Sequence, residues 1–169
     1  MNIEPYLEKH TSALVDELRD FISSPLPEEV RCVEVMVFRE AMPGNPFRIF
    51  FLDRFKGPAK SINNFVPMAN LSTLVDSPDY ISREEAIAEC LGLDDESDQD
   101  LCMEETDRKY SRENLKLAQW FSQCWLAAGG ANYTYSAFIV EEDFQFNPIN
   151  LQSGQHIKHL HDYKKVFDG

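Results

Sequence analysis

The chain has 169 residues, of which 43% are hydrophobic and 27% are charged. This length and composition are typical of a single globular domain over residues 1–169, and they exclude a wholly disordered chain. No apolar run approaches the roughly 20 residues that a membrane-spanning helix needs. The first residues also lack the basic and apolar regions of a signal peptide. The sequence therefore predicts a cytoplasmic protein without a membrane partner.

Charge is distributed unevenly along the sequence. Sixteen basic and twenty-nine acidic residues leave a net charge of −13. Residues 57–110 hold only four of the basic residues but thirteen of the acidic ones. A negative field repels nucleic-acid phosphates and speeds association with basic proteins. We therefore expect no nucleic-acid partner and a basic protein as the partner; the alternative is that the acidity only keeps the protein soluble.

Hydrophobic periodicity predicts the elements of the N-terminal half. Apolar residues spaced three, four and seven apart predict an amphipathic helix over residues 3–22. Alternation of apolar residues predicts strands over 30–38 and 47–55, which the intervening loop, rich in Pro, Gly and Asn, joins as a hairpin. A short strand is expected at Phe65-Val66.

The middle of the chain is predicted as two helices separated by a loop. Ser82 and Glu85 form a capping-box pattern ahead of a short helix that ends at Gly92. Residues 94–107 hold eight carboxylates and no base, and we expect them to form an acidic loop. Ser111 is then expected as the N-cap of a second long helix.

The C-terminal part is predicted as two strands and a polar tail. Gly129-Gly130 should stop the second long helix, and alternation then predicts a strand over 133–141. A further strand over 144–151 is interrupted at Pro148, and residues 156–169 are expected to be frayed. The order of elements predicts an α+β fold, with an antiparallel sheet and helices packed mainly on one face. Six residues are expected in the core: Leu14, Leu18, Val35, Phe51, Phe121 and Ile139.

The four cysteines do not have the spacing of a zinc site. Cys32, Cys90, Cys102 and Cys124 are at least twelve residues apart, and no C-x-x-C pair is present. In a cytoplasmic protein we expect reduced thiols. Cys32 and Cys124 lie in apolar patterns and are expected in the core, whereas Cys102 is expected in the acidic loop.

The acidic loop is the strongest candidate for a binding surface. Its carboxylates occupy positions 1, 3, 5 and 12 of a twelve-residue window that starts at Asp94, as in an EF-hand calcium loop. Position 6, however, is Gln99 where an EF-hand needs glycine. We therefore expect a surface that faces a basic partner, with a calcium loop and a solvated loop as the alternatives. The expected partner-binding carboxylates are Asp94, Asp95, Glu96, Asp98, Asp100, Glu104 and Glu105.

Two other groups of residues are candidates for chemistry. His156, His159 and His161 could ligate a metal such as zinc, and the alternative is a polar C-terminal segment. Glu141-Glu142-Asp143 could act in acid–base catalysis, although adjacent acids at a strand end more often face solvent. No nucleophile elbow, phosphate loop or zinc-protease motif is present. We therefore predict no catalytic residue, no metal and no cofactor.

The two tryptophans point in different directions. Trp120 and Trp125 are five residues apart, which separates them by roughly 140° around a helix. One of them is expected in the core, and the other is available at a partner-binding surface, where aromatic residues act as anchors. We assign the surface position to Trp125.

The second half of the chain resembles a known group of proteins. The features are Trp120-Phe121-x-x-x-Trp125, Gly129-Gly130, the strand 133–141, Phe146-Asn147 and Leu151-x-Ser153-Gly154. This pattern over residues 111–155 resembles bacterial immunity proteins of polymorphic toxin systems, SUKH-type families among them. The resemblance implies a non-catalytic binding protein, an immunity or inhibitor protein that neutralises a basic partner. The alternatives are a small metal-dependent enzyme using the histidines and a housekeeping domain without a dedicated partner.

Overall fold

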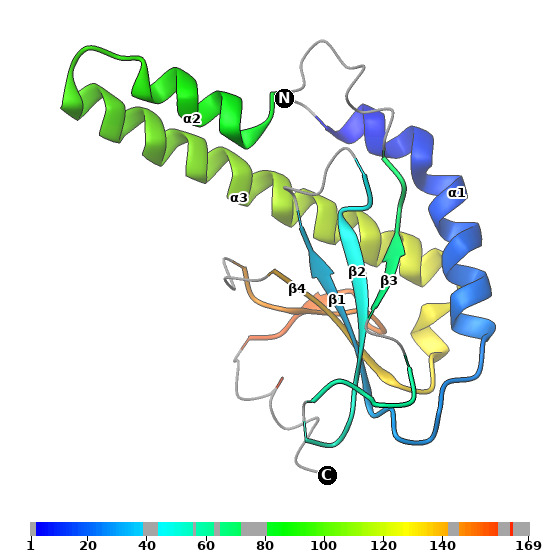
Figure 1. The fold of residues 1–169 in the computed structure, drawn as a ribbon. Helices are drawn as coiled ribbons and strands as arrows, with labels where there is room; N and C mark the ends of the chain where they lie inside the picture. The colour runs from blue at the N-terminus through cyan, green and yellow to red at the C-terminus, as the bar shows by residue number, and fades with distance from the viewer. Residues whose placement is uncertain are drawn as a thin grey trace.

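The computed structural model describes residues 3–38, 44–55, 57–62, 65–71, 81–141, 146–158 and 163. Three α-helices and a six-stranded sheet form the fold, which confirms the α+β prediction (Figure 1). The helices are α1 (Glu4–Ser23), α2 (Arg83–Leu91) and α3 (Glu96–Ala127), and a short 3-10 helix, η3, spans Gly130–Asn132. The strands are β1 (Cys32–Val37), β2 (Phe47–Leu52), β3 (Phe65–Met68), β4 (Ser136–Glu141), β5 (Ile149–Asn150) and β6 (Gln155–His156).

The sheet is mixed rather than antiparallel throughout. Its strand order is β3-β2-β1-β4-β5-β6. The hairpin of β1 and β2 is antiparallel, as predicted, and Val35 lies opposite Ile49. In contrast, β1 pairs in parallel with β4, which brings Val35 opposite Ile139. This parallel pair is possible because η3 and the long α3 carry the chain back to the start of the sheet before β4 begins.

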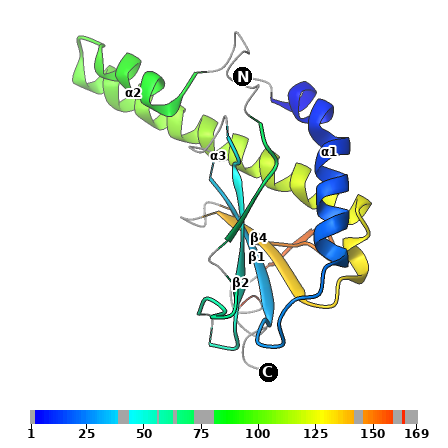
Figure 2. The same cartoon turned by 45° about the vertical axis from the view of Figure 1, so that its right-hand side comes forward.

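Helices α1 and α3 pack on the same face of the sheet, as the two views show (Figures 1 and 2). They bury the side chains that alternate inward from β1, β2 and β4. All six residues expected in the core are buried: Leu14, Leu18, Val35, Phe51, Phe121 and Ile139. Alternation in the strands and the helical spacing in α1 therefore identified the core face correctly.

A smaller apolar cluster lies on the opposite face of the sheet. It contains Cys32 from β1, Phe138 from β4 and Tyr163 from the C-terminal segment. The rings of Phe138 and Tyr163 are 5.2 Å apart, edge to face. Residues 156–169 were expected to be frayed, but Tyr163 packs against the sheet at one point of this segment. The rest of residues 159–169 lies outside the described residues.

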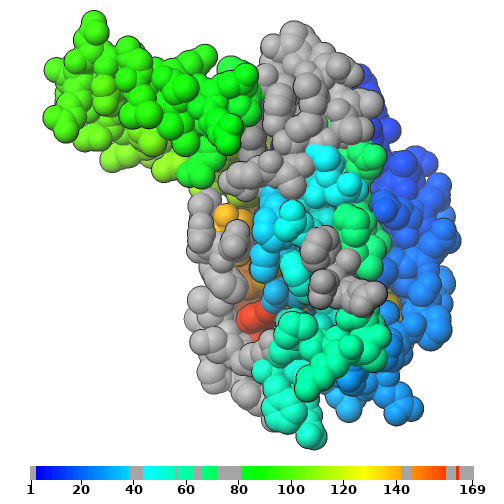
Figure 3. Space-filling view, in the orientation of Figure 1, coloured from blue at the N-terminus to red at the C-terminus, as the bar shows by residue number. Residues whose placement is uncertain are grey.

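The second long helix starts fifteen residues before the expected N-cap. Ser111 lies inside α3, and Asp95 is the residue whose side chain caps the helix, accepting a hydrogen bond from the backbone N–H of Ser97. The acidic stretch expected as a loop is thus mostly helical. At 1.5 Å per residue, the 32 residues of α3 span roughly 48 Å, so its first turns extend beyond the sheet with α2 alongside (Figure 3).

Candidate functional site

The part of α3 that leaves the body of the protein pairs with α2 as a projecting helical hairpin. We call residues 83–107 the arm; it comprises α2, the following turn and α3 as far as Asp107. The first buried residue of α3 is Tyr110, so the part of α3 that belongs to the arm has no residue in the core. In the space-filling view the arm stands away from the rest of the molecule (Figure 3).

Local sequence explains why the arm is helical. Ser82 and Glu85 form the capping box that the sequence predicted at the start of α2. No glycine or proline occurs between Gly92 and Gly129, so nothing breaks α3 once it has started. Glu96 and Asp98 lie in its first turn, where carboxylates are stabilised by the positive end of the helix dipole. A run of acidic residues at this position favours a helix start rather than a loop.

The helical geometry excludes the calcium-loop alternative. Ten of the twelve residues in the window that starts at Asp94 are helical, so their carboxylates point outward around a helix instead of converging on one ion. Within the described residues, no group of three or more His, Cys, Asp and Glu side chains is placed to hold a metal ion.

A disulfide joins the two helices of the arm. Cys90 in α2 is bonded to Cys102 in α3, with their Cα atoms 5.4 Å apart. The expectation of four reduced thiols is therefore wrong for this pair. The sequence contained no local signal for it, because two cysteines twelve residues apart meet only when both helices exist and run antiparallel.

The other two cysteines are buried thiols, as predicted. Cys32 and Cys124 lie in the core. Burial raises the pKa of Cys124 to about 11, and burial followed by the charge of Glu34 raises the pKa of Cys32. Neither thiol is poised to act as a nucleophile, since the thiolate is the reactive form.

The arm carries most of the net charge of the protein. Residues 83–107 contain eleven carboxylates and one arginine, so the arm holds ten of the thirteen net negative charges. All eight carboxylates of residues 94–107 are exposed, including the seven expected in the binding surface: Asp94, Asp95, Glu96, Asp98, Asp100, Glu104 and Glu105.

Two of these carboxylates are already engaged in ion pairs. Glu104 accepts a hydrogen bond from Arg108 at 2.6 Å, and Asp107 accepts one from Arg83 at 3.3 Å. Hydrogen bonds from the side chain and backbone of Ser97 hold the pKa of Asp95 below its usual value. Within the described residues, the six carboxylates of 94–107 other than Glu104 and Asp107 form no ion pair, so the arm is a strongly negative surface at neutral pH.

Trp125 is not at the surface, contrary to the prediction. Its side chain has no exposed area, and its indole N–H donates to the carbonyl oxygen of Gly130 at 3.2 Å. Trp120 is 8% exposed. The two tryptophans point in different directions, and both are buried. Trp120 packs near Phe47 of the sheet, and its indole N–H donates to the hydroxyl of Thr11 in α1. Trp125 packs against Phe121 and Tyr133.

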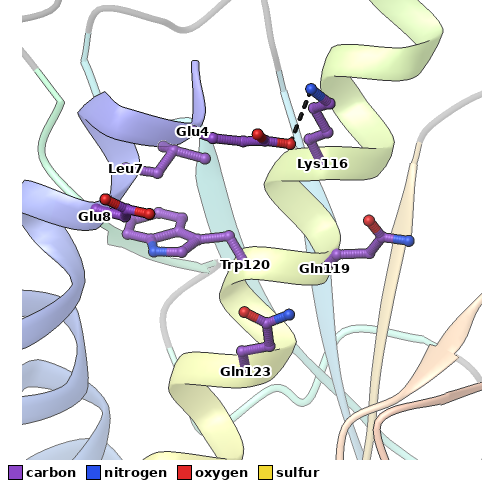
Figure 4. A pocket seen from close by; sticks show the side chains of 7 residues that line it. All are labelled: Glu4, Leu7, Glu8, Lys116, Gln119, Trp120 and Gln123. Carbon is purple, nitrogen blue, oxygen red and sulfur yellow. Dashed lines mark ion pairs between the residues drawn. The ribbon is translucent and has the colours of Figure 1, made fainter. Parts of the chain in front are cut away.

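A pocket of about 260 Å³ lies between α1 and α3 (Figure 4). Trp120 and Leu7 form its apolar part, and the other lining residues are Glu4, Glu8, Lys116, Gln119 and Gln123. Lys116 is paired with Glu4 at 2.9 Å. The pocket is smaller than the roughly 300–1,000 Å³ of most small-molecule sites. Its lining contains no Ser, Cys or His, so it does not hold a hydroxyl or thiol nucleophile with a histidine base.

The histidine cluster lies only partly within the described residues. His156 is exposed in β6, and its Nδ1 is 2.9 Å from the carbonyl oxygen of Asn147. His159 and His161 lie outside the described residues. The proposed metal role of these histidines therefore stays a prediction.

Glu141 is buried rather than solvated at its strand end. It lies at the end of β4 and accepts a hydrogen bond from the amide nitrogen of Asn114 in α3, at 3.4 Å. Glu142 and Asp143 lie outside the described residues. The contact between Asn114 and Glu141 ties α3 to the sheet about two helical turns beyond the end of the arm, which suits a structural role.

A half-buried carboxylate lies on the other face of the sheet. Glu34 of β1 accepts a hydrogen bond from the hydroxyl of Tyr163. Burial raises the pKa of Glu34, and the hydrogen bond from Tyr163 opposes this only in part. The net shift is upward, so ionisation of this carboxyl costs more in the folded protein than in the unfolded chain.

This shift predicts how stability should respond to Glu34→Gln. Below pH 4.5, the ordinary value for this carboxyl, it is protonated in both states and has no ionisation cost. As the pH rises towards the higher folded-state pKa, the unfolded chain ionises first and the wild type loses stability. The variant should therefore be more stable than the wild type at pH 7 and similar to it at pH 4, measured as Tm against pH.

Tyr163→Phe is the matched control for this measurement. It removes the hydrogen bond that lowers the pKa of Glu34, so it should deepen the loss of stability between pH 4 and pH 7. A wild-type profile that is flat over this range, with both variants parallel to it, would contradict the assigned shift.

No protein-family model matches the chain, and neither a curated protein nor a solved structure is significantly similar to it. None of the helices within the described residues is long and apolar enough to cross a membrane. The site must therefore be interpreted from its own geometry and charge.

Proposed function

We propose that this protein is a non-catalytic binding protein that uses the arm to engage a basic partner protein. The observation that carries the proposal is the placement of ten net negative charges on one projecting hairpin. A partner could reach this surface from several sides, because the arm has no core contact before Tyr110. Concentrated charge of this kind speeds the encounter with an oppositely charged protein and selects against like-charged ones.

The proposal includes an immunity or inhibitor role, as the resemblance of residues 111–155 to toxin-immunity proteins implies. In that role the arm would neutralise a basic toxin by covering its surface, without any chemical step by the binding protein. A cytoplasmic location belongs to the same proposal. The disulfide is more usual in oxidising compartments, so measuring its oxidation state in the cell tests the location directly.

The competing enzyme hypothesis has less support within the described residues. The lining of the pocket between α1 and α3 contains no hydroxyl or thiol nucleophile and no histidine, and no metal-ligand group is assembled among the described residues. A housekeeping domain without a dedicated partner would not need its charge on one projection. The position of the charge therefore favours a binding protein.

The test compares neutralisation of the arm with equal neutralisation elsewhere. The arm variant is Asp94→Asn, Asp98→Asn and Asp100→Asn; none of these side chains has an ion pair within the part of the chain that the structure describes. A labelled ten-residue oligo-arginine peptide serves as the cationic probe in stopped-flow association. We expect the arm variant to associate roughly tenfold more slowly at low salt. The difference should vanish towards 1 M salt, where the Debye length is ~3 Å.

The control variant removes the same net charge from the body. It combines Glu8→Gln, Asp20→Asn and Glu28→Gln, which are all exposed and lie outside the arm. Its association rate should stay close to that of the wild type. Equal slowing in both variants would mean that only total charge matters, and the arm would lose its assigned role.

A further inference from the structure

A second pocket, of about 390 Å³, lies where β1 begins and β2 ends. Both ribbon views place this end of the sheet away from the arm (Figures 1 and 2). The volume falls within the roughly 300–1,000 Å³ of most small-molecule sites. We call it the strand-end pocket, and its lining comes from three segments of the chain: Glu29, Arg31, Asp53, Arg54, Phe55 and Lys60.

Backbone hydrogen bonds attach the lining segments to the end of β2. The N–H of Arg31 donates to the carbonyl oxygen of Leu52 at 2.8 Å, and the N–H of Ala59 donates to that of Phe51 at 2.8 Å. The segment before β1 and the segment around Lys60 are therefore both held by the strand whose end carries the third segment.

The two carboxylates of the pocket are used to organise its own backbone. Glu29 accepts hydrogen bonds from the hydroxyl of Ser61 and from its backbone N–H, the latter at 2.6 Å, and these bonds hold the pKa of Glu29 below its usual value. Oδ1 of Asp53 accepts from the N–H groups of Phe55 at 2.8 Å and Gly57 at 3.0 Å. Neither carboxylate forms an ion pair with another described residue.

Three cations line the same pocket without a carboxylate partner. Arg31, Arg54 and Lys60 are exposed, and none of them forms an ion pair within the part of the chain that the structure describes. Three cations and two carboxylates leave the lining at +1, in a protein whose net charge is −13. The charge of the distant arm is screened beyond a Debye length of ~8 Å at physiological salt, so an anion at the pocket meets mainly these cations.

An exposed aromatic ring lies beside the cations. Phe55 is 74% exposed, and the guanidinium carbon of Arg54 lies 4.6 Å from the centroid of its ring. Aromatic rings and guanidinium planes are the surfaces on which the bases of nucleotides stack. Guanidinium groups also match the geometry of phosphate oxygens, to which they donate two hydrogen bonds at once. The pocket therefore combines groups for a phosphate with a surface for a planar ring.

We propose that the strand-end pocket binds a phosphorylated ligand with a planar ring, of the nucleoside-monophosphate class. Arg31 and Lys60 hold the phosphate, and the ring of the ligand stacks on Phe55 beside Arg54. This inference goes beyond the proposed function, because it involves no residue of the arm.

Charge and shape favour this ligand over two others. A nucleic acid extends past the pocket, and the remaining negative charge of the protein repels its phosphates. A nucleoside monophosphate carries a charge of only about −1.5 to −2, and it stays within the pocket. An acidic peptide brings carboxylates but no planar ring, so it gains nothing from Phe55.

The test titrates the wild type at low salt with adenosine 5′-monophosphate, and separately with adenosine and with inorganic phosphate. Every base has a face that can stack, so this one nucleotide is a sufficient probe. We expect it to bind at least about tenfold more tightly than either of its parts, because only the whole ligand uses both the cations and the ring. Isothermal titration calorimetry measures the three affinities.

Two variants separate the roles of charge and ring. Arg31→Gln with Lys60→Gln should weaken binding of the nucleotide roughly tenfold to a hundredfold, since two charge-assisted contacts are lost. Phe55→Ser should lower the affinity for the nucleotide roughly tenfold, to that for inorganic phosphate. The matched control, Lys9→Gln with Arg112→Gln, removes one lysine and one arginine that are exposed and lie outside the pocket. Its affinity should stay close to that of the wild type.

A measurement on the wild type alone does not depend on the folding of any variant. On addition of the nucleotide, NMR should show shifts of the ring protons of Phe55 and of the side-chain Nε–H of Arg31. Absence of these shifts at saturating nucleotide would overturn the assigned pocket.

The other outcomes overturn the inference in distinguishable ways. Equal weakening in the pocket variant and the control would mean that only total charge matters. Inorganic phosphate that binds as tightly as the nucleotide, or a Phe55→Ser variant that binds normally, would remove the ring from the site. Tighter binding of tetraglutamate or of a short single-stranded DNA would assign the pocket to an acidic segment or a nucleic acid. None of these results bears on the arm, whose test uses a cationic peptide and different variants.

Discussion

Replacing Gly130 by alanine is expected to lower the free energy of unfolding by about 3 kcal/mol. Overpacking of a core commonly costs ~1–3 kcal/mol, and here the buried hydrogen bond from the Trp125 indole to the Gly130 carbonyl oxygen would be strained as well. A Cβ atom at this position would overlap the indole of Trp125 and lie 2.7 Å from the carbonyl oxygen of the same residue. The indole cannot move aside easily, because Trp125 is fully buried and its N–H is bonded to Gly130. At roughly 2–4 °C per kcal/mol, Tm should fall by about 6–12 °C.

The neighbouring glycine provides a control for this prediction. Gly129 has a φ of +98°, and a Cβ atom there would have nothing within 4 Å. Its constraint is the left-handed backbone, which asparagine tolerates better than most residues. Gly129→Asn should therefore cost about 1 kcal/mol or less. If Gly130→Ala costs no more than Gly129→Asn in thermal or urea unfolding, the close approach of Trp125 to Gly130 is wrong.

These two glycines show what could be predicted from the sequence. Gly129-Gly130 were predicted to stop a long helix, and α3 ends at Ala127. Strands β1, β2 and β4 were likewise predicted from the sequence, whereas the strand expected over 144–151 is present only as β5 at Ile149–Asn150 and β6 was not predicted. The capping box from Ser82 and Glu85 is present. Such local patterns determine which residues start, end and face the core of an element, because they depend on neighbours in the sequence.

What was missed depends on contacts distant in sequence. The parallel pairing of β1 with β4 follows from the path of the chain through α3, which periodicity does not reveal. Which tryptophan is buried also depends on what surrounds α3: α1 and the sheet enclose both Trp120 and Trp125. The density of charge in residues 94–107 predicted the exposure of its carboxylates correctly but concealed the helix, since the arm buries too few apolar residues to show a strong 3.6-residue period.

The largest local effect is expected from removal of the disulfide. In α2 the one buried residue is Cys90, so the helix has little hydrophobic packing of its own. A nine-residue helix is too short to be stable in isolation, where about 12–15 residues are needed. The bond closes a loop of twelve residues, for which chain entropy gives roughly 3 kcal/mol. The disulfide thus replaces the missing core of the arm.

We expect the variant Cys90→Ala with Cys102→Ala to exchange the backbone amides of α2 about a hundredfold faster than the wild type, because ~3 kcal/mol corresponds to roughly two factors of ten at 1.4 kcal/mol each. Amides of α3 between Leu117 and Trp125 should be unchanged, since they belong to the body. Reduction of the wild type with dithiothreitol should reproduce the effect. So should each single substitution, because either one removes the same bond and the two effects are then not additive. Protection of α2 that survives reduction would show instead that its contacts with α3, including the Arg83–Asp107 pair at 3.3 Å, hold the arm without the bond.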